Sequence, residues 1–307
     1  MRKTSFLPVT LTLIFAFGLL ASCDRRQPPP PPLPVLPGGV GATTVSRADM
    51  HNPDALVDVA MLMTMDMSNV VIVDVSPSPH NVIPGAIWLD RNLLYREIDG
   101  NNVGIETIET HERVFGAHGI GNNTTVILYD DANGMHAARI FWQFRAMGHR
   151  DVRLLNGGLG AWLAAGHPVL ANAAAPGPAV SYTAFNNMGI LRAELDRVLA
   201  AKHNPAYTIL DTRSQAEWDA GRIPGSVQST FPADFLNADF TFKPLHEYEQ
   251  MFAHIPRNTT LILYCGGGLR ASIAYYVFTH IMGWPQPVLL YEGGWNNYTW
   301  AGAPIEW

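Results

Sequence analysis

The sequence of 307 residues lacks several patterns that mark common functions. Acidic residues outnumber basic ones, 26 against 20, and the formal net charge of -6 argues against nucleic acid or anionic lipid as the main partner. The 11 histidines are scattered and include no two pairs at metal-ligand spacing, so no metal site is predicted. Neither Gly-Lys-Ser/Thr nor Gly-x-Gly-x-x-Gly occurs, and we expect no nucleotide cofactor.

A run long enough for a comfortable bilayer span is also missing. The apolar stretch Phe6–Leu20 is shorter than the roughly 20 residues that a spanning helix needs. It ends in Leu20-Ala21-Ser22-Cys23, which resembles the bacterial lipoprotein signal, whose cysteine is diacylated and becomes the new N-terminus. We predict a signal peptide over residues 1–22 and lipidation of Cys23, giving a membrane-anchored lipoprotein that faces the periplasm. Asp24 is compatible with inner-membrane retention. An ordinary cleaved secretory signal and a retained anchor are the alternatives.

Cysteine is scarce, and the only other one is Cys265. If Cys23 carries lipid, no intramolecular disulfide can form, and an exported protein exposes its remaining thiol to oxidation. A chemical role for Cys265 is therefore worth considering. Pro28–Pro32 is an unbroken proline run that favours extended polyproline II, so we predict a semi-rigid tether over residues 23–41. A ligand for a proline-binding domain is the alternative.

The remainder of the chain repeats itself. Val126–Tyr129 reads like Leu261–Tyr264, 135 residues further on, and five more pairs of short segments recur in the same order. We therefore predict a first domain over residues 42–170, an Ala/Pro/Gly-rich linker over 171–180 and a second domain over 181–307. The further pairs are Val71–Asp74 with Thr208–Asp211, Ile83–Gly85 with Ile223–Gly225, Asn123–Thr125 with Asn258–Thr260, Met147-Gly148 with Met282-Gly283, and Gly157-Gly158 with Gly293-Gly294.

Short apolar runs alternate with helical patterns in each copy. The runs are apolar on both faces, which suits central parallel strands covered by helices. This order predicts an α/β fold of two tandem doubly wound domains, each with a central parallel sheet flanked by helices. The expected strands are Val70–Val75, Val126–Tyr129, Tyr207–Asp211 and Thr260–Tyr264, and the expected helices include Leu191–Ala201, Leu245–His254 and Ala271–Met282.

Cys265 directly follows an expected strand and opens a glycine-rich loop before a helix. The glycines Gly266, Gly267 and Gly268 let the backbone N–H groups of the loop converge on one point, which forms an anion nest at a helix N-terminus. A sulfur placed there is favoured as the thiolate, and Arg270 adds positive charge. A glycine-rich turn with a buried, inert cysteine is the alternative.

With this loop the sequence resembles the rhodanese superfamily, specifically its tandem-domain sulfurtransferases, over nearly the whole mature chain. The resemblance includes Asp211-Thr212-Arg213, Glu217-Trp218, Gly221–Gly225 and Tyr291–Trp295, although the family usually has histidine at Arg222. It implies a persulfide mechanism in which Cys265 attacks a sulfane-sulfur donor and passes the sulfur to an acceptor. The six residues from Cys265 to Arg270 match the loop length of sulfurtransferases, whereas related phosphatases have a longer loop.

The expected substrate-binding and thiolate-stabilising residues follow from this loop and from a neighbouring strand. Arg213 comes just beyond a strand end, on the side where Cys265 is expected, and Asp211 is expected to support it. The other expected members are Gly266, Gly267, Gly268, Leu269 and Arg270.

In the first copy Asp130 stands where Cys265 stands in the second. An aspartate cannot carry sulfane sulfur, so we predict a non-catalytic first domain. The expected enzyme takes sulfur from a small anionic donor, thiosulfate or 3-mercaptopyruvate, and gives it to a thiol or cyanide. Small Gly266 and Gly267 resemble the mercaptopyruvate type and Arg270 departs from it, which favours thiosulfate. The alternative is a persulfide-relay or binding module of the cell envelope without small-molecule turnover.

Overall fold

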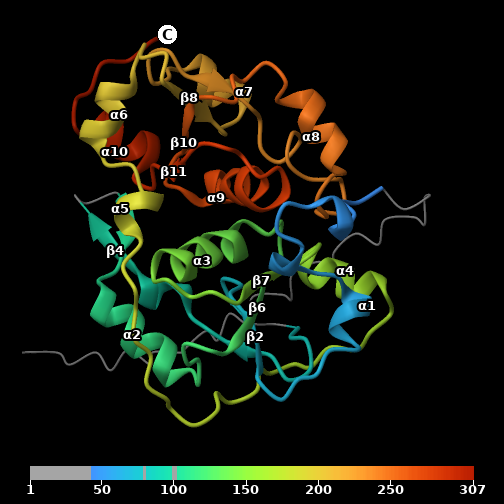
Figure 1. The fold of residues 1–307 in the computed structure, drawn as a ribbon. Coiled ribbons are helices and arrows are strands. Elements are labelled where there is room, and N and C mark those ends of the chain that lie inside the picture. The colour runs from blue at the N-terminus through green and yellow to red at the C-terminus, as the bar shows by residue number, and fades with distance from the viewer. Residues whose placement is uncertain (1–42, 79–80, 99–101) are drawn as a thin grey trace, which may run out of the picture. The chain divides into compact units, whose positions relative to one another are not determined.

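Two parallel sheets of related order lie in the two halves of the chain (Figure 1). The computed structural model describes residues 43–78, 81–98 and 102–307. The strand order is β1-β7-β6-β2-β3 in the first sheet and β11-β10-β8-β9 in the second. The first contains β1 (Leu56–Val57), β2 (Val70–Asp74), β3 (Ile87–Trp88), β6 (Thr125–Tyr129) and β7 (Val152–Leu155), and the second contains β8 (Tyr207–Asp211), β9 (Val227–Gln228), β10 (Thr260–Tyr264) and β11 (Val288–Leu290).

Helices alternate with these strands, as the α/β prediction requires. A separate antiparallel hairpin of β4 (Tyr95–Ile98) and β5 (Asn102–Ile105) belongs to the first copy. The helices of the first half are η1 (Arg47–Asp49), η2 (Pro53–Ala55), α1 (Val59–Leu62), η3 (Arg91–Leu94), α2 (Ile108–Ala117), α3 (Met135–Ala146) and α4 (Gly158–Ala164). Those of the second are α5 (Met188–Leu191), α6 (Leu195–Ala201), α7 (Gln215–Asp219), α8 (Leu245–Met251), α9 (Leu269–Tyr276), η4 (Val277–Ile281) and α10 (Gly294–Trp300).

The four expected strands are confirmed as β2, β6, β8 and β10, with bounds that differ from the prediction by at most one residue. Each pairs in parallel with its neighbour, β2 with β6 and β8 with β10. Their residues are buried toward the carboxyl ends, where Asp74, Tyr129, Asp211 and Tyr264 lie. Burial on both faces explains why these runs are continuously apolar rather than alternating.

Two of the expected helices are wrong in extent. The pattern over Leu191–Ala201 forms two helices, because the N–H of Ala193 donates to the carbonyl of Leu290 in β11 and the chain between α5 and α6 is extended there. The pattern also predicts a common buried face for Leu199 and Val198, but Leu199 is exposed whereas Val198 is buried. The helix expected from Leu245 to His254 ends earlier, at Met251.

One cluster of buried apolar side chains spans both copies. Helices α3 and α9 pack against each other across the boundary between copies, side by side in Figure 1. Phe141 of α3 meets the rings of Tyr276 and His280 at centroid distances of 5.1 and 4.9 Å. The buried apolar side chains of both helices belong to a single cluster. The first copy therefore packs against the helix that follows the Cys265 loop.

Some predictions concern residues outside this description. The expected signal peptide, the lipidation site Cys23 and the tether over 23–41 lie outside the described residues. The expected linker over 171–180 lies between α4 and α5. Within the described ranges, no helix is long and apolar enough to cross a membrane.

Candidate active site

Cys265 lies at the carboxyl end of β10 and opens the loop that leads into α9. Only 2% of the residue is exposed, so its thiol sits within the loop rather than on the surface. Gly268 is the N-cap of α9 with φ +84°, a backbone conformation that favours glycine, and the Ser272 hydroxyl donates to its carbonyl at 2.7 Å. The first-turn N–H groups of α9 are therefore available to a group held by the loop.

A second glycine turn fixes the other side of the loop. The N–H groups of Trp295 and Asn296 donate to the carbonyls of Cys265 and Gly266 at 2.7 and 3.0 Å. A Cβ on Gly294 would lie 2.4 Å from the Cys265 carbonyl oxygen, so only glycine allows this close approach. The C=O and N–H of one peptide point in opposite directions. Because these carbonyls point toward the Gly294 turn, the N–H groups that follow them in the loop point away from that turn.

The first copy shows what such a loop binds. Asp130 follows β6 as Cys265 follows β10, and a Cβ on Gly158 would lie 2.7 Å from the Asp130 carbonyl oxygen. The Asp130 carboxylate accepts four backbone hydrogen bonds at 3.0 Å, two on each oxygen, from the N–H groups of Ala132, Gly134, His136 and Ala137. The loop of the first copy is thus an anion cradle, and Asp130 fills it with its own carboxylate.

The two cradles differ in length by one residue. The loop from Asp130 to the N-cap Gly134 is one residue longer than the loop from Cys265 to the N-cap Gly268. The helix that follows in the second copy takes up this difference, because it continues as the π-helical turn η4, and a π turn accommodates an extra residue. The offset of 135 residues is thereby restored at Met147 and Met282.

Arg270 is directed at the cradle and is also paired. It donates to both carboxylate oxygens of Glu217, at 2.6 and 2.8 Å. These bonds hold the pKa of Glu217 at about 2, and hydrogen bonding to Glu217, followed by the neighbouring Cys265 sulfur, raises the pKa of Arg270. The expected placement of Arg270 beside Cys265 is therefore observed, but Glu217 offsets part of its charge.

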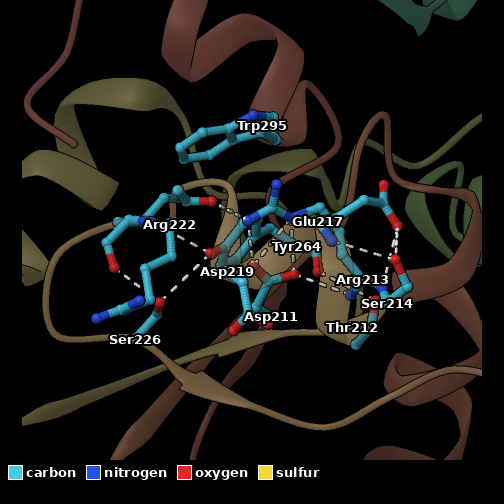
Figure 2. A network of polar contacts seen from close by, with 12 residues as sticks. Asp211, Thr212, Arg213, Ser214, Glu217, Asp219, Arg222, Ser226, Tyr264 and Trp295 are labelled. Atoms are coloured by element: carbon cyan, nitrogen blue, oxygen red, sulfur yellow. Dashed lines mark hydrogen bonds and ion pairs between the residues drawn. The ribbon is translucent and has the colours of Figure 1, made fainter. Parts of the chain in front are cut away.

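Arg213 follows β8 at the same sheet edge as Cys265, where the sequence predicts it, but its guanidinium is paired there. It is 2% exposed and forms an ion pair with Asp211, whose carboxylate accepts from its Nε and from Nη2 at 2.7 Å. Its Nη2 also donates to the carbonyl of Gly221, and its guanidinium lies 4.3 Å from the ring centroid of Trp295, which stands above it in Figure 2. This arrangement favours a role in positioning the Trp295 turn over the expected role in binding the donor, with Asp211 as its support.

The comparisons with known proteins agree with this geometry. The model of the rhodanese-like domain matches residues 60–165 and again 194–301. The chain belongs to the rhodanese family. It is 30% identical to thiosulfate sulfurtransferase of Bos taurus over 73% of this chain and 80% of that protein. The corresponding enzyme of Mus musculus is 31% identical over 72% of this chain and 78% of that one.

Solved structures show the same fold. The crystal structure of YnjE matches with a TM-score of 0.68 and 26% identity, covering 83% of this chain and 68% of that chain. The wild-type structure of EanB matches with a TM-score of 0.72 and 24% identity, covering 83% and 69%. The predicted fold of two rhodanese-like domains is confirmed. At the general level of sulfur transfer, the expected enzyme class is confirmed as well.

Glu217 is the member of this rhodanese site that the sequence prediction left out. The sequence indicates it only as part of the family resemblance. A local signal was present, because Ser214 and Glu217 have the spacing of a capping box and form one at the start of α7. That box fixes Glu217 on the first turn of α7, from which its carboxylate reaches Arg270. The role of Arg139, described below, has no such local signal.

Proposed function

We propose that this protein transfers sulfane sulfur from a small anionic donor to a thiophilic acceptor through a persulfide on Cys265. The thiolate of Cys265 attacks the outer sulfur of the donor. With thiosulfate, the S–S bond breaks and sulfite leaves with its electron pair, so the outer sulfur stays on Cys265. An acceptor such as cyanide or a thiolate then attacks that outer sulfur, and Cys265 leaves as the thiolate. No redox partner is needed.

The observation that carries this proposal is the Asp130 cradle. In the first copy, the loop directs four N–H groups at one anionic group attached to its first residue. In the second copy that residue is Cys265, and the persulfide formed on it is an anion held by a short side chain. The same arrangement therefore stabilises the intermediate after sulfur transfer.

Thiosulfate is the donor that we propose. The relatives named above are thiosulfate sulfurtransferases, and the loop offers N–H donors together with Arg270 to an anionic substrate. Pairing with Glu217 weakens the attraction by Arg270, and Gly266 and Gly267 bring no charge. We therefore expect a preference for thiosulfate that is modest. Comparing kcat/KM for thiosulfate and 3-mercaptopyruvate tests it, and a higher value for 3-mercaptopyruvate contradicts it.

Mass spectrometry of the intact full-length protein, purified in detergent, tests the reaction itself. After thiosulfate treatment we expect one added sulfur atom on Cys265, which cyanide removes. Cys265→Ser should gain none, because a hydroxyl cannot store sulfane sulfur, whereas Cys23→Ser should behave like the parent. If folded protein whose Cys265 is accessible to an alkylating agent in a parallel sample takes up no sulfur from either donor, the proposal is refuted. Uptake without turnover of thiosulfate and cyanide supports the relay module instead.

We further propose that the protein is held at the membrane by lipid on Cys23, with residues 23–41 as a tether. The Leu20-Ala21-Ser22-Cys23 site and the proline run support this. The protein should fractionate with membranes and be released by detergent but not by salt, and Cys23→Ser should remain unprocessed. Mature wild-type protein found free in the soluble fraction contradicts the proposal.

A further inference from the structure

A buried arginine of the first copy lies directly behind the loop of the second. Arg139, on the second turn of α3, is 1% exposed. A Cβ built on Gly268, the N-cap of α9, would lie 3.0 Å from Arg139 Nη1 and 2.9 Å from the carbonyl oxygen of Glu292. The guanidinium therefore touches the backbone at the point where the Cys265 loop becomes the helix.

An ion-pair network fixes this guanidinium. Arg139 Nη2 donates to Glu292 Oε2 at 2.5 Å, and its Cζ lies 5.0 Å from the ring centroid of Trp142. Glu292 also has Arg192 Nε 3.0 Å from Oε1, although these two atoms are not aligned as a hydrogen bond. Glu292 immediately precedes the Gly293-Gly294 turn, which anchors the Cys265 carbonyl through Trp295. Arg139 thus links both segments that shape the loop.

The ion pair with Glu292 engages Nη2 of Arg139 and leaves Nη1 unpaired. Nη1 is buried and has no aligned hydrogen-bond partner among the described residues, although the buried Tyr95 hydroxyl lies near the guanidinium. A buried guanidinium with an unsatisfied N–H group is costly, and such groups in native proteins call for an explanation. Nη1 is the Arg139 atom that approaches Gly268, so the positive charge is presented to the back of the loop.

The pseudo-symmetric position in the other copy makes the same contact without charge. A Cβ on Gly134, the N-cap of α3, would lie 3.6 Å from Ile273 Cδ1. Ile273 follows its N-cap Gly268 by five residues, as Arg139 follows Gly134. The copy with Cys265 thus presents isoleucine to the loop already occupied by the Asp130 carboxylate. The copy without a nucleophile presents arginine to the loop that holds the sulfur.

We propose that Arg139 is a positioning residue of the sulfur-transfer site, supplied by the non-catalytic copy. Its buried positive charge, oriented by Glu292, holds the N-terminus of α9 against the Gly293-Gly294 turn and favours an anionic sulfur on Cys265. The first copy therefore completes the site instead of serving only as a structural partner. This inference rests on the proposed persulfide function.

Paired substitutions of Arg139 separate charge from packing. Arg139→Met keeps most of the apolar stem and removes the charge, whereas Arg139→Lys keeps the charge and loses the planar fork. Two rates are measured on full-length protein in detergent, namely persulfide formation from thiosulfate and alkylation of Cys265 by neutral iodoacetamide at pH 7. We expect Arg139→Met to slow both about tenfold, and Arg139→Lys to restore much of the loss. A packing role alone predicts the opposite order, because methionine suits a buried site better than lysine.

A control addresses general disturbance of the interface. Phe141→Leu alters the same helix, and Phe141 packs on Tyr276 and His280. It should lower stability and leave both rates per folded molecule unchanged. If Arg139→Met does not fold, Arg139→Met combined with Glu292→Gln removes both charges of the pair, so that the Glu292 carboxylate is not left buried without Arg139. That double variant should be slow in both rates.

The outcomes are distinguishable from failure of the proposed function. Wild type that takes up no sulfur refutes the persulfide function, whatever the variants do. Wild type that takes up sulfur, together with Arg139→Met or the folded double variant at wild-type rates, overturns the role of Arg139. Arg139→Met faster than Arg139→Lys overturns it as well.

Discussion

Replacing Asp130 with alanine empties the cradle of the first copy. Its carboxylate is buried and accepts four backbone N–H groups, two of them from the first turn of α3. Alanine leaves all four donors without this partner, in a part of the molecule that water enters poorly. The carboxylate also interacts favourably with the positive end of the α3 dipole. We therefore expect a large loss of stability from a residue that takes no part in sulfur chemistry.

The magnitude follows from the number of bonds and the space available. A hydrogen bond to a charged group contributes about 1.5–3 kcal/mol, so four independent bonds would amount to roughly 6–12 kcal/mol. These bonds share one group and are not independent. A cavity of about 20 Å³ borders Asp130, with room for about one water that can satisfy some of the donors. We expect the free energy of unfolding to fall by about 3–5 kcal/mol.

Denaturant unfolding of wild type and Asp130→Ala measures this change. Asp130→Asn is a matched control, because it keeps the size of the side chain but places an NH2 group opposite backbone N–H donors. It should lose about as much stability as Asp130→Ala. Acetate, compared with chloride at equal ionic strength, should stabilise Asp130→Ala and not wild type by refilling the cradle. Persulfide formation per folded molecule should remain unchanged. A stability within about 1 kcal/mol of wild type would show that the loop is not an anion cradle.

Three further predictions concern the second copy. Gly268→Ala should lower the free energy of unfolding by about 1–3 kcal/mol and slow alkylation of Cys265, because φ is +84° and the new Cβ would meet the Glu292 carbonyl at 2.9 Å. Gly160→Ala, whose Cβ meets nothing within 4 Å, is the control and should be neutral or stabilising in denaturant unfolding. Arg270→Ala should slow alkylation of Cys265 at pH 6 and raise KM for anionic donors. It should also remove the stabilisation by Glu217, whose folded pKa of about 2 lies below its ordinary 4.5; that stabilisation is present above pH 4.5 and is lost as the pH falls toward 2. In the variant, the free energy of unfolding should therefore depend less on pH between 4.5 and 2. Burial lowers the pKa of His280 from 6.5 to about 3, so the stability contributed by its neutral form is present above pH 6.5 and is lost as the pH falls toward 3, by about 2 kcal/mol at pH 5. His280→Phe should flatten the pH dependence of the free energy of unfolding in this range, and an unchanged slope would contradict the assignment.

Local pattern was sufficient for the framework of the site. The strands were predictable because a buried parallel strand is apolar on both faces, and this can be recognised within five residues. Chain order then places Cys265 and Asp130 at strand ends, each ahead of a helix. The glycine-rich loop indicates converging N–H groups for the same local reason. Leu191–Ala201 failed as one helix because a long-range bond between Ala193 and Leu290 overrides the local periodicity.

The sequence by itself determined the duplication, the α/β order and the contrast between Cys265 and Asp130, because each of these is written in residue type and spacing along one stretch of chain. Only the tertiary structure decided the partners of the charged side chains. Arg270 meets Glu217 across 53 residues, and Arg139 meets Glu292 across 153. Such pairs depend on how α3, α7 and α9 pack and on which side chains that packing buries. A buried guanidinium needs a partner, but it can take that partner from any segment that the fold brings near.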